Sequence, residues 1–177
     1  MTAESHYLDA LEALEADDRE EALLHARKAI KLDPEHADAW RIVSDASLPG
    51  LRKQPTLKQA ASSLSAAKKV VALQPDDLAM WVRGGRLLSD ELGLYMDALQ
   101  WWQDARHHAP EEVTPIVEQA AILADMGLYG EASERLQSII DENMDVATTQ
   151  YGRIHQLLGL VRSAASQDAS EHFKPWE

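Results

Sequence analysis

Apolar residues along this chain recur at steps of three and four, the spacing that places side chains on one face of an α-helix. Ala and Leu dominate while Val, Ile and Thr are sparse, so local propensity favours helix almost everywhere, and no strand is predicted. The pattern predicts nine helices, at about residues 3–16, 18–32, 35–47, 57–73, 76–91, 94–108, 114–126, 128–142 and 145–165.

Three of the breaks between helices resemble one another. Their sequences are LDPEHADAW (32–40), LQPDDLAMW (73–81) and HAPEEVTPI (108–116). Each has a proline, then acidic residues, then a large apolar residue six positions after the proline. The prolines are 41 and 35 residues apart, a period typical of helical repeat arrays.

Elementary backbone chemistry explains these breaks. Proline lacks an N–H group and has a fixed φ, so it suits the first turn of a new helix and stops the previous one. The residue before it is pushed out of the α conformation. We expect the Asp33 carboxylate to cap the helix that follows, and the acidic residues after each proline to complement its dipole.

Each predicted repeat also contains an internal break that separates its two helices. The breaks read ADDR (16–19), LGLY (92–95) and MGLY (126–129), and a small residue follows three positions later at Ala22, Ala98 and Ala132. Further residues of the same stripe follow at steps of four and three. Small residues on this stripe allow two antiparallel helices to approach closely, so we interpret the stripe as core.

With these residues the chain resembles the tetratricopeptide-repeat (TPR) family over about residues 3–145. First helices match at Trp40-x2-Val43-Ser44 and Trp81-x2-Gly84-Gly85, and second helices match at Ala22-x3-Ala26-x2-Ala29 and Tyr95-x2-Ala98-x3-Trp102-x2-Ala105. The resemblance implies an all-α fold, a right-handed solenoid of about four antiparallel helix pairs plus a C-terminal capping helix.

The chain departs from the repeat pattern in places. The first unit has no tryptophan, and the fourth lacks its closing proline. The second unit carries extra residues in segment 47–57, where Pro49, Gly50 and Pro55 predict a loop.

The predicted array spans residues 1–166 and is followed by a tail at 167–177. Its units are about 3–34, 35–75, 76–110 and 111–145, and helix 145–165 covers the apolar flank of the last unit. Phe173 and Trp176 in the tail either fold back onto the array, form an exposed binding element or are disordered.

Charge limits the classes of partner. The chain of 177 residues has a net charge of −13, which argues against nucleic acids and anionic membranes. No apolar run is long enough to span a membrane, so membrane insertion is not expected. The N-terminal sequence lacks the features of a secretory signal, which favours a cytoplasmic location.

No motif for catalysis or cofactor binding is evident. The chain has no cysteine, and none of its seven histidines forms an H-x3-H or H-E-x2-H pair on one helix face. Phosphate-binding glycine loops and nucleophile elbows are also absent from the sequence. We therefore expect a protein that is not an enzyme and has no metal site and no cofactor.

The family resemblance implies a binding groove lined by the first helices of the units. The predicted binding residues are Arg41, Ile42, Asp45, Val82, Arg83, Arg86, Val117 and Glu118. The three arginines suit carboxylates, which suggests an acidic peptide or a C-terminal carboxylate as ligand. The alternative is that they neutralise local acids such as Asp38, Asp45 and Asp90.

Positive charge concentrates in residues 41–69. This segment has six basic residues and one acidic residue, a local balance of +5, so the rest of the chain carries −18. We call it the basic segment; three of its residues form a predicted contact with an acidic partner or another copy. These contact residues are Arg52, Lys53 and Lys58. The alternative is an ordinary solvated face.

Two functions therefore fit the sequence. One is a protein–protein interaction scaffold or adaptor that binds a peptide or partner segment in its concave groove. The other is a self-assembling, oligomeric structural protein that uses the ends of the array or the basic segment.

Overall fold

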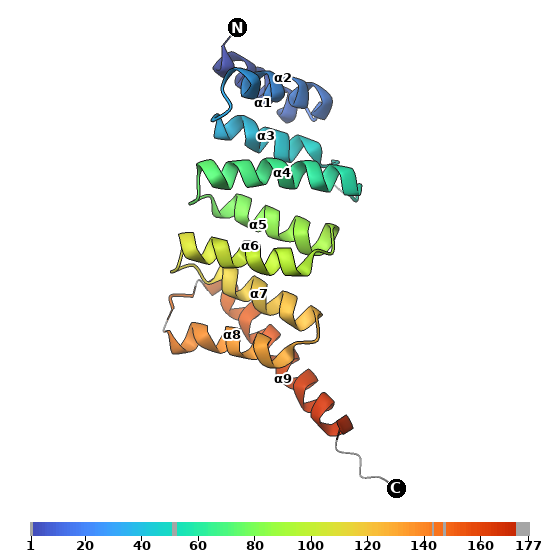
Figure 1. The fold of residues 1–177 in the computed structure, drawn as a ribbon, viewed down its shortest axis with the longest axis vertical. Helices are drawn as coiled ribbons and strands as arrows, with labels where there is room; N and C mark the ends of the chain where they lie inside the picture. The colour runs from blue at the N-terminus through green and yellow to red at the C-terminus, as the bar shows by residue number, and fades with distance from the viewer. Residues whose placement is uncertain (1, 51–52, 143, 147, 173–177) are drawn as a thin grey trace. The chain divides into compact units, whose positions relative to one another are not determined.

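The computed structural model describes residues 2–50, 53–142, 144–146 and 148–172. The chain divides into two compact units, Met1–Trp101 and Trp102–Glu177, and each is described by itself below. Across the described ranges the secondary structure is entirely helical (Figure 1). No helix among these residues is both long and apolar enough to cross a membrane.

The helices agree closely with the predicted ranges. The two exceptions are the predicted helix 76–91, which is divided, and the last helix, which begins at Thr148 and runs past 165 to His172. Phe173 and Trp176 lie outside the described residues. The elements are α1 (Ala3–Glu15), α2 (Arg19–Leu32), α3 (Ala37–Ser47), α4 (Leu57–Leu73), α5 (Leu78–Arg86), the π-helical segment η1 (Leu87–Glu91), α6 (Tyr95–His108), α7 (Thr114–Asp125), α8 (Tyr129–Asp141) and α9 (Thr148–His172).

The proline breaks show why a tryptophan stands six residues after the proline. The indole N–H of Trp40 donates to the carbonyl oxygen of Pro34 at 2.9 Å, and that of Trp81 donates to Pro75 at 2.8 Å. Each bond closes the connecting turn onto the helix that follows it. The prolines lie in these turns, before the helices begin, and not in the first helical turn as predicted.

The predicted cap of α3 is wrong. Asp33 is the C-cap of α2, and its carboxylate accepts a hydrogen bond from the backbone of Glu35 within the turn at 3.0 Å. The cap of α3 is His36, whose Nδ1 accepts from the backbone N–H of Ala39 at 3.3 Å. The helix begins at Ala37, two residues later than predicted, and His36 directly before it is the capping residue in place of Asp33.

The internal breaks share a residue with a left-handed backbone conformation. Gly93 and Gly127 have φ angles of 65° and 78°, and each lies two residues before the next helix begins. Asp17 occupies the corresponding place before α2 with a φ of 58°. This left-handed conformation favours glycine, and aspartate is among the few other residues that adopt it readily.

The division of the predicted helix 76–91 follows from one extra residue. Buried small residues mark the middle of the first helix and the start of the second: Ala10 and Ala22 in one pair, Ala120 and Ala132 in another. Both spacings are 12 residues, but Gly85 and Ala98 are 13 apart. The surplus residue is accommodated in η1, where the N–H of Leu92 bonds to the carbonyl of Leu87 at 3.0 Å.

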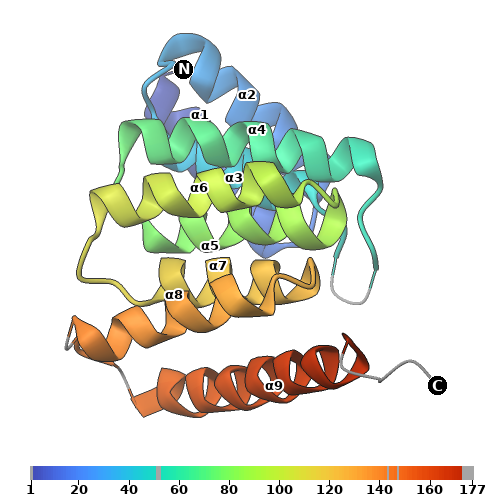
Figure 2. The same ribbon diagram turned by 60° about the horizontal axis from the view of Figure 1, so that its bottom comes forward.

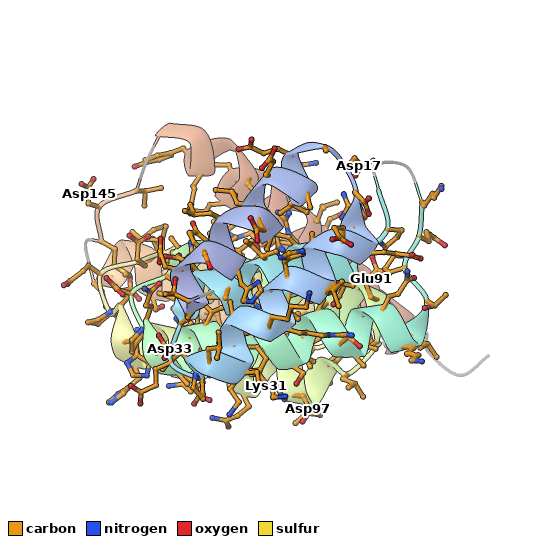
Figure 3. The ribbon with its side chains drawn as sticks, turned by 90° about the horizontal axis from the view of Figure 1, so that it is seen from above. Asp17, Lys31, Asp33, Glu91, Asp97 and Asp145 are labelled. Carbon is orange, nitrogen blue, oxygen red and sulfur yellow. The ribbon has the colours of Figure 1, made fainter. Side chains whose placement is uncertain are left out.

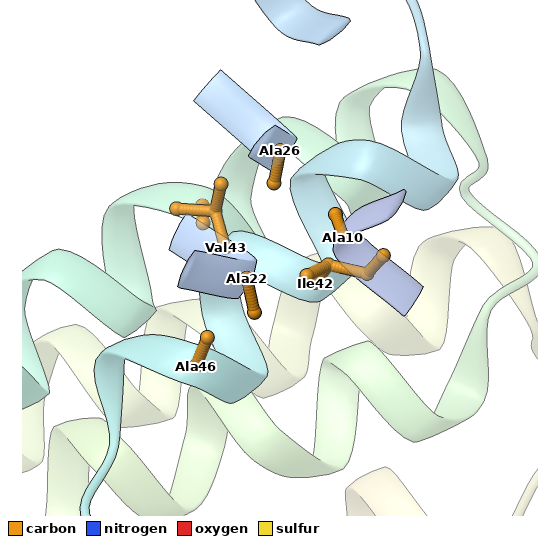
Figure 4. Packing of buried hydrophobic residues seen from close by; sticks show 7 residues of the cluster. Ala10, Ala22, Ala26, Ile42, Val43 and Ala46 are labelled. Atoms are coloured by element: carbon orange, nitrogen blue, oxygen red, sulfur yellow. The ribbon is translucent and has the colours of Figure 1, made fainter. Parts of the chain in front are cut away.

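In the first unit, α1 to α5 pack sequentially, each against the next, and α1 also contacts α3 (Figure 2). One buried cluster joins residues of α1, α2 and α3 with Ala66 of α4 (Figure 4). Its labelled members are Ala10, Ala22, Ala26, Ile42, Val43 and Ala46. Alanine side chains on α1 and α2 let these helices approach closely, as the sequence predicted. Charged residues such as Lys31, Asp33 and Asp97 are exposed and lie at the outer edge (Figure 3).

In the second unit, α8 packs against both α7 and α9, and α9 also contacts α7. Ile154, Leu158 and Val161 form the buried stripe of α9. The predicted apolar face of the last helix is therefore present and covered.

Candidate functional site

Two of the predicted binding arginines lie in the first unit and already contact carboxylates. Arg41, on α3, places Nη2 2.6 Å from Oδ2 of Asp77 and 2.9 Å from the side-chain oxygen of Gln74, and its Nε is 3.8 Å from Asp38. Asp77 is also the N-cap of α5, with its other oxygen accepting from Met80. Arg41 therefore connects α3 to the start of α5, and Asp77 is the partner that the sequence analysis missed.

Arg83, on α5, forms an ion pair with Asp45 on α3. Burial of the Arg83 guanidinium, and secondarily the positive charge of Arg41, lower the pKa of Arg83 from its ordinary value. The two arginines thus lie within electrostatic range of each other. Local acids partly neutralise both of them, as the alternative interpretation expected for Asp38 and Asp45.

A surface pocket of about 450 Å³ adjoins this ion pair. Three cationic side chains, Arg19, Lys53 and Arg83, line it together with one carboxylate, Asp45. Its other lining residues are Leu14, Leu48, Pro49 and Gly50. We call it the α3–α5 pocket. It brings together residues of the predicted groove and Lys53 of the basic segment, which the sequence analysis treated as separate sites.

Arg19 forms one rigid wall of the α3–α5 pocket. Its Nη1 donates to the backbone carbonyls of Asp45 at 3.0 Å and Leu48 at 2.9 Å, and its Nε donates to Asp17 at 3.0 Å. These bonds fix the C-terminal end of α3 to the start of α2. The sequence analysis missed Arg19 because its partners are backbone atoms of a distant segment.

The remaining predicted groove residues have different surroundings. Ile42 and Val117 are only 4% and 2% exposed, so they are packing residues and do not present a surface to a ligand. Val82 is half-buried and Arg86 is exposed. Glu118 lies in the second unit, where Arg153 of α9 donates to both of its carboxylate oxygens at 2.5 and 3.0 Å. The α3–α5 pocket is built within the first unit and includes neither Val117 nor Glu118.

The three predicted contact residues of the basic segment do not form one patch. Arg52 lies outside the described residues, and Lys53 lines the α3–α5 pocket. Lys58 lines two adjoining hollows of about 500 and 470 Å³, which also share Arg27, Ser47 and Ser62. We call them the α2–α4 groove.

The α2–α4 groove is lined by Ser47, whose hydrogen bonding is unusual. Ser47 Oγ is buried and, within the described part of the chain, has no hydrogen-bond partner. A buried hydroxyl without a partner is energetically unfavourable, so this position suits a polar group from outside.

No protein-family model and no curated protein matches the chain. Solved structures do match it. The crystal structure of MamA has a TM-score of 0.70 at 15% identity, covering 97% of this chain and 88% of that one. YrrB, described as a TPR protein with an unusual peptide-binding site, has a TM-score of 0.62 at 16% identity, covering 89% and 74%. PilW, a type IV pilus biogenesis factor, has a TM-score of 0.57 at 17% identity, covering 92% and 72%.

The chain has a TPR fold. α1 packs against α2, α3 against α4 and α7 against α8, the helix pairing of this fold. In the pair α3–α4, the small residues that face each other are Ser44 and Ser63. Their hydroxyls lie 3.0 Å apart, and each donates to the other's backbone carbonyl, at 3.1 and 2.8 Å. Arg41 and Asp45 lie on α3, and Arg83 lies on α5.

Proposed function

We propose that the chain is a non-enzymatic protein-interaction scaffold that binds an acidic peptide segment on the first helices α3 and α5. The observation that carries this proposal is the α3–α5 pocket, where three cationic side chains face one carboxylate. We further propose the repeat boundaries 3–34, 35–75, 76–110 and 111–145 as the units of the scaffold.

The electrostatics of the pocket favour a negatively charged ligand. Burial and the neighbouring Arg41 both disfavour the charged form of Arg83, and one carboxylate partner compensates for this only in part. A ligand carboxylate entering the pocket would add a second compensating charge. A planar guanidinium also accepts a carboxylate in a bidentate geometry, which gives orientation as well as affinity.

Pocket size limits how much of a ligand is recognised. A volume of about 450 Å³ accommodates one or two side chains or a chain terminus, and not a whole folded partner. The rest of a bound segment would lie along α3 and α5. YrrB, which shares the fold, is described as having a peptide-binding site, and this supports the class of ligand.

Fluorescence anisotropy with short labelled peptides tests the proposal. A glutamate-rich peptide with a free C-terminus should bind, and Lys53→Glu should weaken binding about tenfold or more, because it reverses an exposed charge at the pocket without breaking an ion pair. The matched control is Lys28→Glu, an exposed lysine of α2 outside the pocket lining.

The same peptide with an amidated C-terminus separates the two ligand types. Loss of binding on amidation identifies a C-terminal carboxylate as the recognised group, and retained binding identifies side-chain carboxylates. Equal affinities of Lys53→Glu, Lys28→Glu and the unmodified chain would contradict the proposed site.

Self-association through the basic segment is a second candidate function. The α2–α4 groove carries Arg27 and Lys58, and the buried hydroxyl of Ser47 faces no partner within the described residues. Because the chain outside residues 41–69 carries a charge of −18, an acidic flank of a second copy is electrostatically complementary to this groove.

Light scattering at low and high salt tests self-association. A complex held by these charges should form at about 0.05 M salt and dissociate at about 0.5 M, since the screening length falls with ionic strength. Lys58→Glu should prevent its formation. A monomer at both salt concentrations would exclude this second function and leave the peptide-binding proposal unaffected.

A further inference from the structure

Three side chains that commonly bind metals meet between α1 and α2, away from the α3–α5 pocket. His6 and Asp9 lie one turn apart on α1, and His25 comes from α2. Nδ1 of His25 is 3.4 Å from Nδ1 of His6 and 3.2 Å from Oδ2 of Asp9. Nδ1 of His6 is 4.0 Å from the same aspartate oxygen.

These distances suit a small divalent ion. Three atoms separated by 3.2, 3.4 and 4.0 Å lie on a circle with a radius of about 2.1 Å. An ion at its centre would therefore be at about the distance that Zn²⁺ keeps from imidazole nitrogen, ~2.0–2.1 Å, and from carboxylate oxygen, ~2.0–2.2 Å.

A second carboxylate orients His25 for this role. Nε2 of His25 is 3.0 Å from Oε1 of Glu21, one turn earlier on α2. If Nε2 carries the proton and donates it to Glu21, Nδ1 presents a lone pair to Asp9 and His6. A carboxylate bonded to the distal nitrogen of a ligating histidine is the common outer-shell arrangement of metal sites.

A cation would stabilise this cluster. With Nε2 of His25 protonated, its Nδ1 lone pair and the Asp9 carboxylate face each other at 3.2 Å, which is repulsive unless a cation lies between them. A metal ion bound to both groups resolves this repulsion. The third group, the half-exposed Asp9 carboxylate, leaves the cluster open to ions from solvent, while both imidazoles are largely buried.

We propose that His6, Asp9 and His25 bind one divalent transition-metal ion, with Zn²⁺ the best match. Two imidazoles and one carboxylate suit this class of ion, whereas Mg²⁺ and Ca²⁺ prefer oxygen ligands alone. Glu21 is a positioning residue that holds His25. The bound ion would link α1 to α2 and leave a fourth coordination position for water or a ligand.

This cluster has no counterpart among histidine pairs on single helices, the pattern on which the expectation of no metal site was based. His6 and Asp9 have a suitable i,i+3 spacing, but His25 is 19 residues from His6. Only the antiparallel packing of α1 and α2 brings the third ligand into place.

Titration of the chelator-treated full chain with Co²⁺ tests the proposal. We expect one equivalent to bind with the visible absorption of Co²⁺ in a low-symmetry protein site, and Zn²⁺ to displace it. His25→Ala and Asp9→Ala should abolish this signal, and Glu21→Gln should weaken Zn²⁺ binding about 10- to 100-fold. The matched control, His155→Ala, removes an exposed imidazole of α9 and should change nothing.

A second measurement does not depend on the variants folding. In the unmodified chain, Zn²⁺ should shift the imidazole ring-nitrogen NMR signals of two of the seven histidines, His6 and His25. Absence of saturable binding would overturn the proposal. A Co²⁺ signal that persists in folded His25→Ala would place the ion elsewhere and would also overturn it.

Discussion

The helix pairs α1–α2 and α5–α6 have different side chains at matching sequence positions within each pair. His6 stands four residues before the buried Ala10, as Trp81 stands four before the buried Gly85. His25 follows Ala22 by three residues, as Trp101 follows Ala98. Two tryptophan rings 4.6 Å apart in one pair are therefore replaced by two imidazole rings 5.5 Å apart in the other.

The residue three positions after Trp81 or His6 differs in the same way. Gly84 lies against the Trp101 ring, where a Cβ would collide with it. Asp9 occupies the corresponding place in α1 and contacts the two imidazoles. A bulky dry contact requires the absence of a side chain at this point, whereas two small polar rings leave space for a carboxylate. One framework position thus gives either core packing or an ion-binding cluster, depending on three residues.

Removal of the aromatic ring at the matching position of each pair should give the largest difference in stability between the two pairs. Trp101→Ala should lower the free energy of unfolding by about 3–5 kcal/mol, since it leaves a large cavity and removes the 2.7 Å bond from the indole to the carbonyl of Trp81. His25→Ala, at the matching position, should cost less in the metal-free chain because its ring is smaller and partly exposed. Urea unfolding followed by circular dichroism measures both, and equal losses would contradict the comparison.

The repeat architecture was predictable from sequence because it depends on local signals. Proline breaks, glycine at left-handed positions and stripes of alanine all act within a few residues of the chain. The π-helical segment η1 was not predicted. It results from a single extra residue between Gly85 and Ala98, which the periodicity of a whole helix does not reveal.

The sites were less predictable because they depend on which helices meet. Arg41 and Arg83 were identified from their offset to the tryptophans, but Asp77, the partner of Arg41, and Arg19, which lines the pocket, come from other parts of the chain. Ile42 was assigned to the groove because an offset of one residue separates the groove face from the core face of α3. The His6–Asp9–His25 cluster joins two helices and has no signature on either one.

Adding a methyl group at Gly84 should give the next largest effect on stability. Gly84→Ala should destabilise the chain by about 1–3 kcal/mol, because the new Cβ overlaps the Trp101 ring and forces it to move. Trp101→Leu in the same chain should relieve most of that added cost, which a double-mutant cycle measures as a coupling energy. Asp9→Ala, the matching substitution in α1, should cost less than about 1 kcal/mol in the metal-free chain, since Asp9 is 43% exposed. Additive effects of Gly84→Ala and Trp101→Leu would show that the two positions do not constrain each other.

Substitutions in the turns that join the two helices of each pair should give the smallest difference in stability. Gly93, before α6, has a φ of 65° and open space around it, so Gly93→Ala introduces no clash and its cost is conformational. We expect a loss of about 1 kcal/mol, the cost of a left-handed alanine less the entropy that alanine removes from the unfolded chain. Asp17 already adopts φ of 58° in the turn before α2, so Asp17→Gly should change stability by less than about 0.5 kcal/mol. Aspartate tolerates this conformation, and its bond to Arg19 is exposed to solvent. Thermal unfolding of the two variants measures the difference, and a loss at Asp17 as large as that at Gly93 would show that the aspartate carboxylate, and not the backbone conformation, holds the first turn.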